Sequence, residues 1–303
     1  MASTVSKLTE RGLISPPTWL PDNIMFEGLQ GSNAYGVAVD TSDFDIVGFC
    51  IPPKDIIFPH LAGAIEGFGR QKKRFVCYQK HHVRDRHAQG GAGREYDFNI
   101  YSIVHYFHLA MQNNPNMLTS LFLPQDCILF TTKIGELVRD KRRIFLHKGA
   151  WHRFKGYAYS QLSEMGRTPD PGSKREALVK QFGYDVKFAY HVVRLVYEIE
   201  QILTTGDVDL RRNAEELKAI RRGDVPEQQI RDFFAAKEKF LETLYEKSAL
   251  PWGPREEEIK QLLLDCLEEH YGSLEGCVVT AQDPLRALRD IACIIDENRH
   301  LLR

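Results

Sequence analysis

The sequence has 303 residues, of which 43% are hydrophobic, and its formal net charge is −1. This length supports one large or two modest domains with hydrophobic cores. The balanced charge excludes a basic surface over the whole protein, so any nucleic-acid site must be a local patch. The six cysteines include no Cys-x-x-Cys pair, which argues against a zinc site or a disulfide framework. Because there is no signal-peptide core and no run of about 18 apolar residues, we expect a cytoplasmic protein without a membrane partner.

The N-terminal part of the chain predicts two strands joined by a tight turn. Residues 1–23 form a polar lead-in that ends in several prolines. The apolar run Ile24–Leu29 predicts a strand, and a second strand is expected to open with Asp43 and Asp45 and to end at Ile51. Between them, the Gly-Ser pair at 31–32 predicts a sharp turn with a short helical segment.

This turn and the second strand carry the residues with the clearest chemistry. The backbone N–H groups of Gly31 and Ser32 would point outward at the start of a helical turn, where anionic oxygens are favoured. Asp43 and Asp45 are two residues apart, so their carboxylates leave the same face of a strand. Two like charges so close favour a divalent cation between them. The other interpretation is an ordinary polar turn in which Asp43 bonds to the local backbone.

A basic segment with interspersed aromatic residues follows between residues 70 and 94. Such a segment can bind a nucleic-acid strand through phosphate attraction and base stacking. The candidate nucleic-acid-binding residues are Lys72, Lys73, Arg74, Arg84 and Arg86. The same composition fits a solvated β-hairpin whose charges protect an exposed sheet edge. Both interpretations stay open.

A third carboxylate is expected in the stretch 94–100. Asp97 lies between Tyr96 and Phe98, which is the apolar setting of a strand residue. Glu95 faces the same side and is the rival candidate. The alternative role for Asp97 is the N-cap of a helix that starts near Tyr101.

From residue 101 onward the apolar residues recur at helical spacing. We expect a broken pair of helices over 101–122, and only helices after about residue 150, over 175–204, 212–222, 226–248, 255–271 and 283–302. In the helix predicted over 175–204, Tyr184, Lys187, His191 and Arg194 fall on one face. This face is either a basic binding surface or a solvated one, with His191 as a semi-buried histidine.

The Gly-Ser pair, a spacer of about ten residues and Asp-x-Asp on a strand resemble the signature of the DNA polymerase β-like nucleotidyltransferase superfamily. The fuller pattern Gly-Ser-x-Ala-Tyr-Gly followed by Ser-Asp-x-Asp resembles the nucleotidyltransferases of RNA-repair gene clusters. This resemblance implies that two Mg²⁺ ions, for which Mn²⁺ could substitute, are held by Asp43, Asp45 and Asp97. It also implies a nucleoside triphosphate bound by Gly31, Ser32, Tyr35, Lys187, His191 and Arg194.

The resulting prediction is an α+β protein with a short mixed sheet. Residues 24–125 form the catalytic domain after the lead-in of residues 1–23, and residues 126–303 form a helical domain that closes the nucleotide cleft. The predicted reaction transfers a nucleoside monophosphate from the triphosphate to a hydroxyl of an RNA or tRNA end and releases pyrophosphate. Two alternatives remain: nucleotidylation of a protein or small molecule, and a non-catalytic nucleotide- or RNA-binding module.

Overall fold

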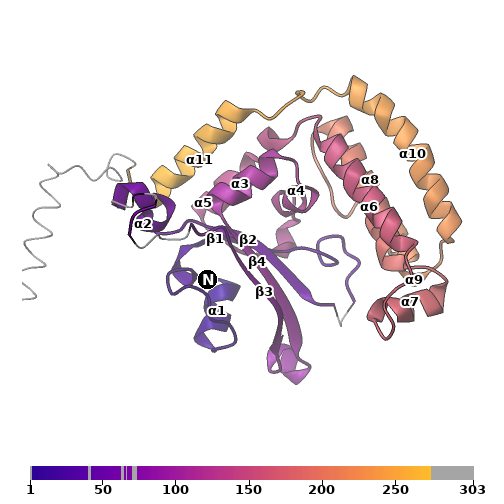
Figure 1. The fold of residues 1–303 in the computed structure, drawn as a ribbon, viewed down its shortest axis with the longest axis horizontal. Coiled ribbons are helices and arrows are strands. Elements are labelled where there is room, and N and C mark those ends of the chain that lie inside the picture. The colour runs from indigo at the N-terminus through magenta and orange to yellow at the C-terminus, as the bar shows by residue number, and fades with distance from the viewer. Residues whose placement is uncertain (1, 40–41, 63–64, 66, 70–73, 274–303) are drawn as a thin grey trace, which may run out of the picture.

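The computed structural model describes residues 2–39, 42–62, 65, 67–69 and 74–273. In this part of the chain, five strands form one sheet in the order β3-β4-β2-β1-β5 (Figure 1). The strands are β1 (Ile24–Leu29), β2 (Phe44–Cys50), β3 (Cys77–Asp85), β4 (Arg94–Ser102) and β5 (Ile128–Thr131). β2 and β4 run parallel, whereas the other neighbouring strands are antiparallel. The sheet is therefore mixed, and the predicted α+β class is confirmed.

Helices surround the sheet and make up most of the second half of the chain (Figure 1). They are α1 (Thr4–Glu10), α2 (Lys54–Ile57), α3 (Ile103–Met111), α4 (Pro115–Leu121), α5 (Lys133–Asp140), α6 (Ala150–Met165), α7 (Lys174–Phe182), α8 (Val186–Thr205), α9 (Ala214–Arg222), α10 (Glu227–Lys247) and α11 (Glu256–Tyr271). α8 is the central helix of the second half, since α6, α9 and α10 all pack against it. The helix expected over 283–302 lies outside the described residues.

Local sequence explains where several of these helices begin and end. The side chain of Ser102 caps α3, and that of Asn114 caps α4, so the expected helix pair is confirmed. The single helix predicted over 175–204 was wrong, because Gly183 ends α7 in the left-handed conformation and Asp185 caps α8. None of the described helices is long and apolar enough to cross a membrane.

Helix α1 and strand β5 lie outside the predicted limits of the catalytic domain, residues 24–125. The expected polar lead-in contains α1, whose Val5 and Leu8 are buried. Its first N–H groups bond to the buried carboxylate of Glu27 on β1, which fixes the helix to the sheet. β5 pairs with β1, so a boundary after residue 125 would separate a strand from its own sheet.

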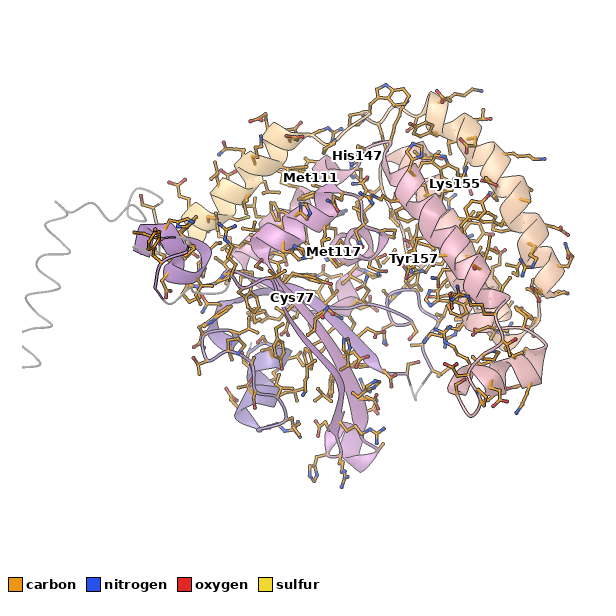
Figure 2. All side chains as sticks on the ribbon, viewed as in Figure 1. Cys77, Met111, Met117, His147, Lys155 and Tyr157 are labelled. Carbon is orange, nitrogen blue, oxygen red and sulfur yellow. The ribbon has the colours of Figure 1, made fainter. Side chains whose placement is uncertain are left out.

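A buried connection ties the start of the helical region to the helix on the sheet (Figure 2). The ring of His147 donates from Nε2 to the carbonyl oxygen of Met111 in α3, at 2.9 Å, and its Nδ1 accepts from the Gly149 N–H just before α6. Nearby, Asn113 donates to the carbonyl of Phe145 at 2.7 Å. These bonds hold the helical region against the sheet, and the candidate site lies where the two meet.

Candidate active site

The three aspartates lie together at one end of the parallel strand pair. In the register of β2 and β4, Asp45 is the direct neighbour of Asp97, which places the two Cα atoms about 5 Å apart. Asp43 comes two residues before Asp45, at the entry to β2. All three side chains line one pocket of about 550 Å³, together with Gly31, Ser32 and Lys187. We call it the aspartate pocket.

The Gly-Ser turn packs directly onto Asp45. Gly31 has a φ of +63°, and a Cβ atom there would lie 2.0 Å from Oδ2 of Asp45, so only glycine fits. The N–H of Gln30 also donates to the Asp45 carbonyl at 2.8 Å. The predicted short helix is absent, because residues 31–36 form successive turns. Within the described part of the chain, the N–H groups of Gly31 and Ser32 donate to no protein acceptor, which leaves them available to an anion.

The electrostatics of the pocket suit a bound cation. Burial raises the pKa of the Asp45 carboxyl and the neighbouring Asp97 raises it further, while Lys187 has the opposite effect. The negative charge on Asp45 is therefore unfavourable in the protein alone. Three carboxylates at one end of the paired strands β2 and β4 provide the oxygen ligands that Mg²⁺ and Mn²⁺ prefer. The donor set fits the divalent ions that the sequence predicted.

The structure separates the two candidates for the third carboxylate. Asp97 lines the aspartate pocket and accepts the backbone N–H of His82 at 2.7 Å. His82 has a φ of +57° in an irregularity of β3, which turns its N–H toward Asp97. Glu95 instead bonds to the His82 ring at 2.5 Å and to Arg84 at 3.3 Å. Asp97 is also no helix cap, since Ser102 caps α3.

His82, Glu95 and Asp97 bring potential ligand atoms within 4.8 Å of one another. The hydrogen bond between His82 and Glu95 raises the pKa of the imidazole and lowers that of the carboxyl. Both groups therefore have a hydrogen-bond partner within the protein, whereas burial and Asp97 disfavour the charged form of Asp45. Asp97, which lies beside Asp45, stays the predicted third ligand.

The opposite wall of the pocket comes from the helical region. Lys187, Tyr190 and His191 of α8 line it, and so does Arg221 in the last turn of α9. Nδ1 of His191 and the hydroxyl of Tyr190 are buried and have no hydrogen-bond partner in the part of the chain that the structure describes. Burial, followed by the charges of Arg194 and Lys187, lowers the pKa of His191 well below its usual range, so the imidazole is neutral.

Arg221 was missed in the sequence. Its guanidinium donates to the carbonyl of Val37 at 3.2 Å and lies over the ring of Tyr190. The only available signal was a basic pair at the end of a predicted helix, which is common because cations stabilise helix C-termini. Arg221 reaches the end of the Gly-Ser turn because the fold brings together two residues that are 184 positions apart in the sequence, which local patterns do not show.

Two predicted nucleotide ligands lie elsewhere. Tyr35 and Arg194 are buried and do not line the aspartate pocket. Arg194 donates to the Tyr35 hydroxyl at 2.8 Å, and that hydroxyl donates to Glu198 at 2.6 Å. The structure therefore places Tyr35 and Arg194 behind the aspartate pocket, and their predicted contact with the nucleotide stays a prediction.

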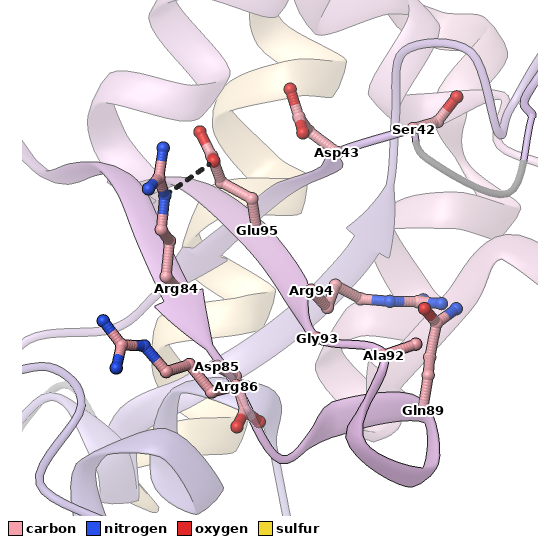
Figure 3. Close-up of a pocket in the computed structure, with 10 residues that line it drawn as sticks. All are labelled: Ser42, Asp43, Arg84, Asp85, Arg86, Gln89, Ala92, Gly93, Arg94 and Glu95. Atoms are coloured by element: carbon pink, nitrogen blue, oxygen red, sulfur yellow. Dashed lines mark hydrogen bonds and ion pairs between the residues drawn. The ribbon is translucent and has the colours of Figure 1, made fainter.

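The basic segment forms the sheet edge and a second pocket. β3 is the edge strand and forms a hairpin with β4, as the edge-hairpin interpretation predicted. Arg84, Arg86 and Arg94 line a pocket of about 700 Å³ (Figure 3), which we call the arginine pocket. Ser42 and Asp43 line both pockets, so the two meet at the aspartates.

The other three candidate nucleic-acid-binding residues do not line the arginine pocket or lie outside the described residues. Arg74 is exposed and lines neither pocket. Lys72 and Lys73 lie outside the described residues. Within the arginine pocket, Arg84 pairs with Glu95 (Figure 3). The Arg94 guanidinium stacks on the ring of Phe44, 3.5 Å from its centroid.

Comparison with known proteins gives one extensive match. The sequence profile of the RNA repair pathway DNA polymerase beta family, RlaP, matches residues 10–276. No curated protein matches. Among solved structures, a nucleotidyltransferase-like protein from Exiguobacterium sibiricum 255-15 aligns over 88% of this chain and 72% of its own, with 10% sequence identity and a TM-score of 0.28.

Proposed function

Since the chain belongs to the RNA repair pathway DNA polymerase beta family, we propose that it transfers a nucleoside monophosphate from a nucleoside triphosphate to a hydroxyl acceptor. The proposed acceptor is an RNA or tRNA end, and pyrophosphate is the second product. One observation carries the proposal: Asp43, Asp45 and Asp97 share a pocket with the free N–H groups of the Gly-Ser turn and with Lys187. Carboxylates for cations and donors for phosphates are the two requirements of this chemistry.

Each side of the aspartate pocket has a distinct task in this proposal. Asp43, Asp45 and Asp97 would hold two divalent cations, which would supply charge stabilisation at the α-phosphate and lower the pKa of the acceptor hydroxyl. The N–H groups of Gly31 and Ser32 bind the triphosphate oxygens. Lys187 and Arg221 approach from the helical region and stabilise the charge that develops on pyrophosphate. The acceptor oxygen forms a bond to the α-phosphorus as the bond to the leaving pyrophosphate breaks.

The arginine pocket is the proposed acceptor side. In-line displacement requires the acceptor to approach opposite the leaving group, and the arginine pocket adjoins the aspartate pocket at Asp43. Arg86 and Arg84 are exposed cations that can contact phosphodiester groups of an RNA strand. A protein or small-molecule acceptor remains the second candidate, because the same catalytic groups would serve it.

Incubation of the purified protein with each α-labelled nucleoside triphosphate, Mg²⁺ and a mixed pool of tRNA and short RNA tests the proposal. We expect label on RNA with the unmodified protein and none with Asp45→Ala. Label on the protein itself, or none despite magnesium-dependent triphosphate binding, would favour another acceptor. Absence of any triphosphate binding would contradict nucleotidyl transfer and favour a non-catalytic role.

A further inference from the structure

A buried polar cluster lies behind the aspartate pocket and contains a residue of the Gly-Ser turn. Tyr35 is 1% exposed, and its hydroxyl accepts from Arg194 and donates to Glu198. Thr119 of α4 lies 3.1 Å from the same hydroxyl and 3.5 Å from the Glu198 carboxylate. We call Tyr35, Thr119, Arg194 and Glu198 the tyrosine cluster. It joins the turn to α4 and α8 at a single buried oxygen atom.

The charges of this cluster give the Tyr35 hydroxyl a set orientation. Arg194 is 5% exposed and Glu198 is 3% exposed, and their side chains pair at 3.5 Å. Hydrogen bonds to charged groups are stronger than those between neutral groups, and a buried ion pair leaves few other partners for either residue. Burial also raises the pKa of Tyr35, so the phenol keeps the proton that it donates to Glu198.

Two arginines hold the turn on either side of Tyr35. Arg211 donates to the carbonyl of Asn33 at 3.4 Å and pairs with Asp126 at 2.8 Å. Arg221 donates to the carbonyl of Val37 at 3.2 Å. The turn is therefore attached to the helical region at three positions, residues 33, 35 and 37.

The same helix connects this cluster to the phosphate side of the pocket. Lys187 lies two helical turns before Arg194 on α8. A displacement of the turn relative to α8 would therefore change the distance between the Gly31 and Ser32 N–H groups and the Lys187 ammonium. Both must reach the same triphosphate.

From these contacts we infer that Tyr35 is a positioning residue that holds the Gly31–Ser32 turn in register with Lys187 for triphosphate binding. The inference rests on the proposed function. Tyr35 touches no substrate and acts through the turn. Its effect should appear in nucleotide affinity more than in the chemical step, because the turn contacts the triphosphate both before and during transfer.

The variant Tyr35→Phe removes the hydroxyl and leaves the ring and the Arg194–Glu198 pair in place. Tyr106→Phe is the matched control, because Tyr106 is equally buried and, among the described residues, its hydroxyl bonds only to Ser120, at 2.6 Å. We expect Tyr35→Phe to weaken magnesium–triphosphate binding by about tenfold and to raise KM similarly, with kcat nearly unchanged. The control should stay within about twofold of the unmodified protein.

Two further measurements identify the route of the effect. Hydrogen exchange at the amides of residues 31–37 should be faster in Tyr35→Phe and unchanged in Tyr106→Phe. If Tyr35 acts through the turn, adding Arg211→Met, which removes the attachment at Asn33, to Tyr35→Phe should cost less affinity than the two single losses combined.

Equal triphosphate affinity and equal exchange in the Tyr35 variant and the unmodified protein would overturn the inference. If Tyr35 had a purely structural role, both tyrosine variants would unfold at a lower midpoint and would bind the triphosphate with equal affinity. That result would also overturn the inference. If the unmodified protein binds no magnesium–triphosphate, the proposed function fails instead. The exchange measurement then still decides whether Tyr35 holds the turn.

Discussion

The aspartate pocket and the tyrosine cluster lie side by side and treat their charged groups in opposite ways. In the pocket, burial and the neighbouring Asp97 raise the pKa of Asp45, and Lys187 on the opposite wall is exposed. In the cluster, Arg194 and Glu198 are buried and are bonded to each other and to Tyr35. Both regions draw on the same face of α8. Under the proposed function, pairing and burial, not residue type or helical spacing, separate the proposed ligand-binding cation Lys187 from the structural cation Arg194.

The largest expected effect comes from removing a pocket charge. Asp45→Asn should lower nucleotidyl transfer by at least about 10³-fold, since the amide cannot replace a carboxylate ligand. It should not lower the stability of the cation-free protein, because burial and Asp97 already disfavour the Asp45 carboxylate there. Transfer assays and urea unfolding without divalent ions check both parts. Substantial activity in Asp45→Asn would remove the basis of the catalytic assignment.

The two cations of α8 offer the most direct contrast. Arg194→Met should destabilise the fold by about 3–5 kcal/mol, because Glu198 would be left buried without its partner. Lys187→Met should leave unfolding nearly unchanged and reduce transfer by about 10²-fold through lost stabilisation of the phosphates. Urea unfolding and steady-state kinetics of both variants check this. Similar behaviour of the two variants would contradict the division between pocket and cluster.

Patterns of neighbouring residues predicted the parts of the site that depend on local geometry. The strand Ile24–Leu29 was predicted with its observed ends. The alternation around Asp45 correctly placed both early aspartates on one side, because a strand has a period of two residues. The structure also places Asp97 next to Asp45, although the parallel pairing of β2 and β4 lies beyond what local patterns show.

The errors came from contacts between residues far apart in the chain. The spacing of Lys187 and Arg194 predicted a common role, but Tyr35 and Glu198 occupy Arg194. A short helical segment was expected after Gly31, but the chain forms successive turns there. Arg211 and Arg221 donate hydrogen bonds to carbonyl oxygens in and next to these turns. Gly183 was predicted to lie within a helix, since an isolated glycine is tolerated within helical patterns.

The arginine pocket should respond more weakly than either region. Its cations face solvent, so each phosphate contact contributes modestly. The double variant Arg84→Ala/Arg86→Ala should weaken RNA binding about three- to tenfold, and the slope of log K against log salt should fall by about 0.7 per lost contact. Triphosphate affinity should not change, because neither arginine lines the aspartate pocket.

The control for this prediction removes the same charge elsewhere. Lys239→Ala/Lys247→Ala takes two exposed cations from α10, on the far side of the molecule from β3 (Figure 1). Titrations of both double variants at several salt concentrations make the comparison. An equal loss of RNA affinity and slope in both would indicate a general charge effect and no specific acceptor surface.

The smallest expected effect concerns His191, the pocket residue whose environment most resembles that of the cluster. Burial and then the nearby cations, Arg194, Lys187, Arg221 and Arg175, lower its pKa far below the usual value of about 6.5. As the pH falls through about 6.5, the unfolded chain takes up a proton at this position and the folded protein does not, so stability decreases.

The variant His191→Gln has no imidazole to protonate. Between pH 7.5 and 5.5 its free energy of unfolding should therefore fall less than that of the unmodified protein, by on the order of 1 kcal/mol. Urea unfolding at several pH values measures it, with His152→Gln as the exposed control on α6. If His191→Gln follows the pH dependence of the unmodified protein, the imidazole is not held neutral by its surroundings, and His191 belongs with the solvated groups of the pocket.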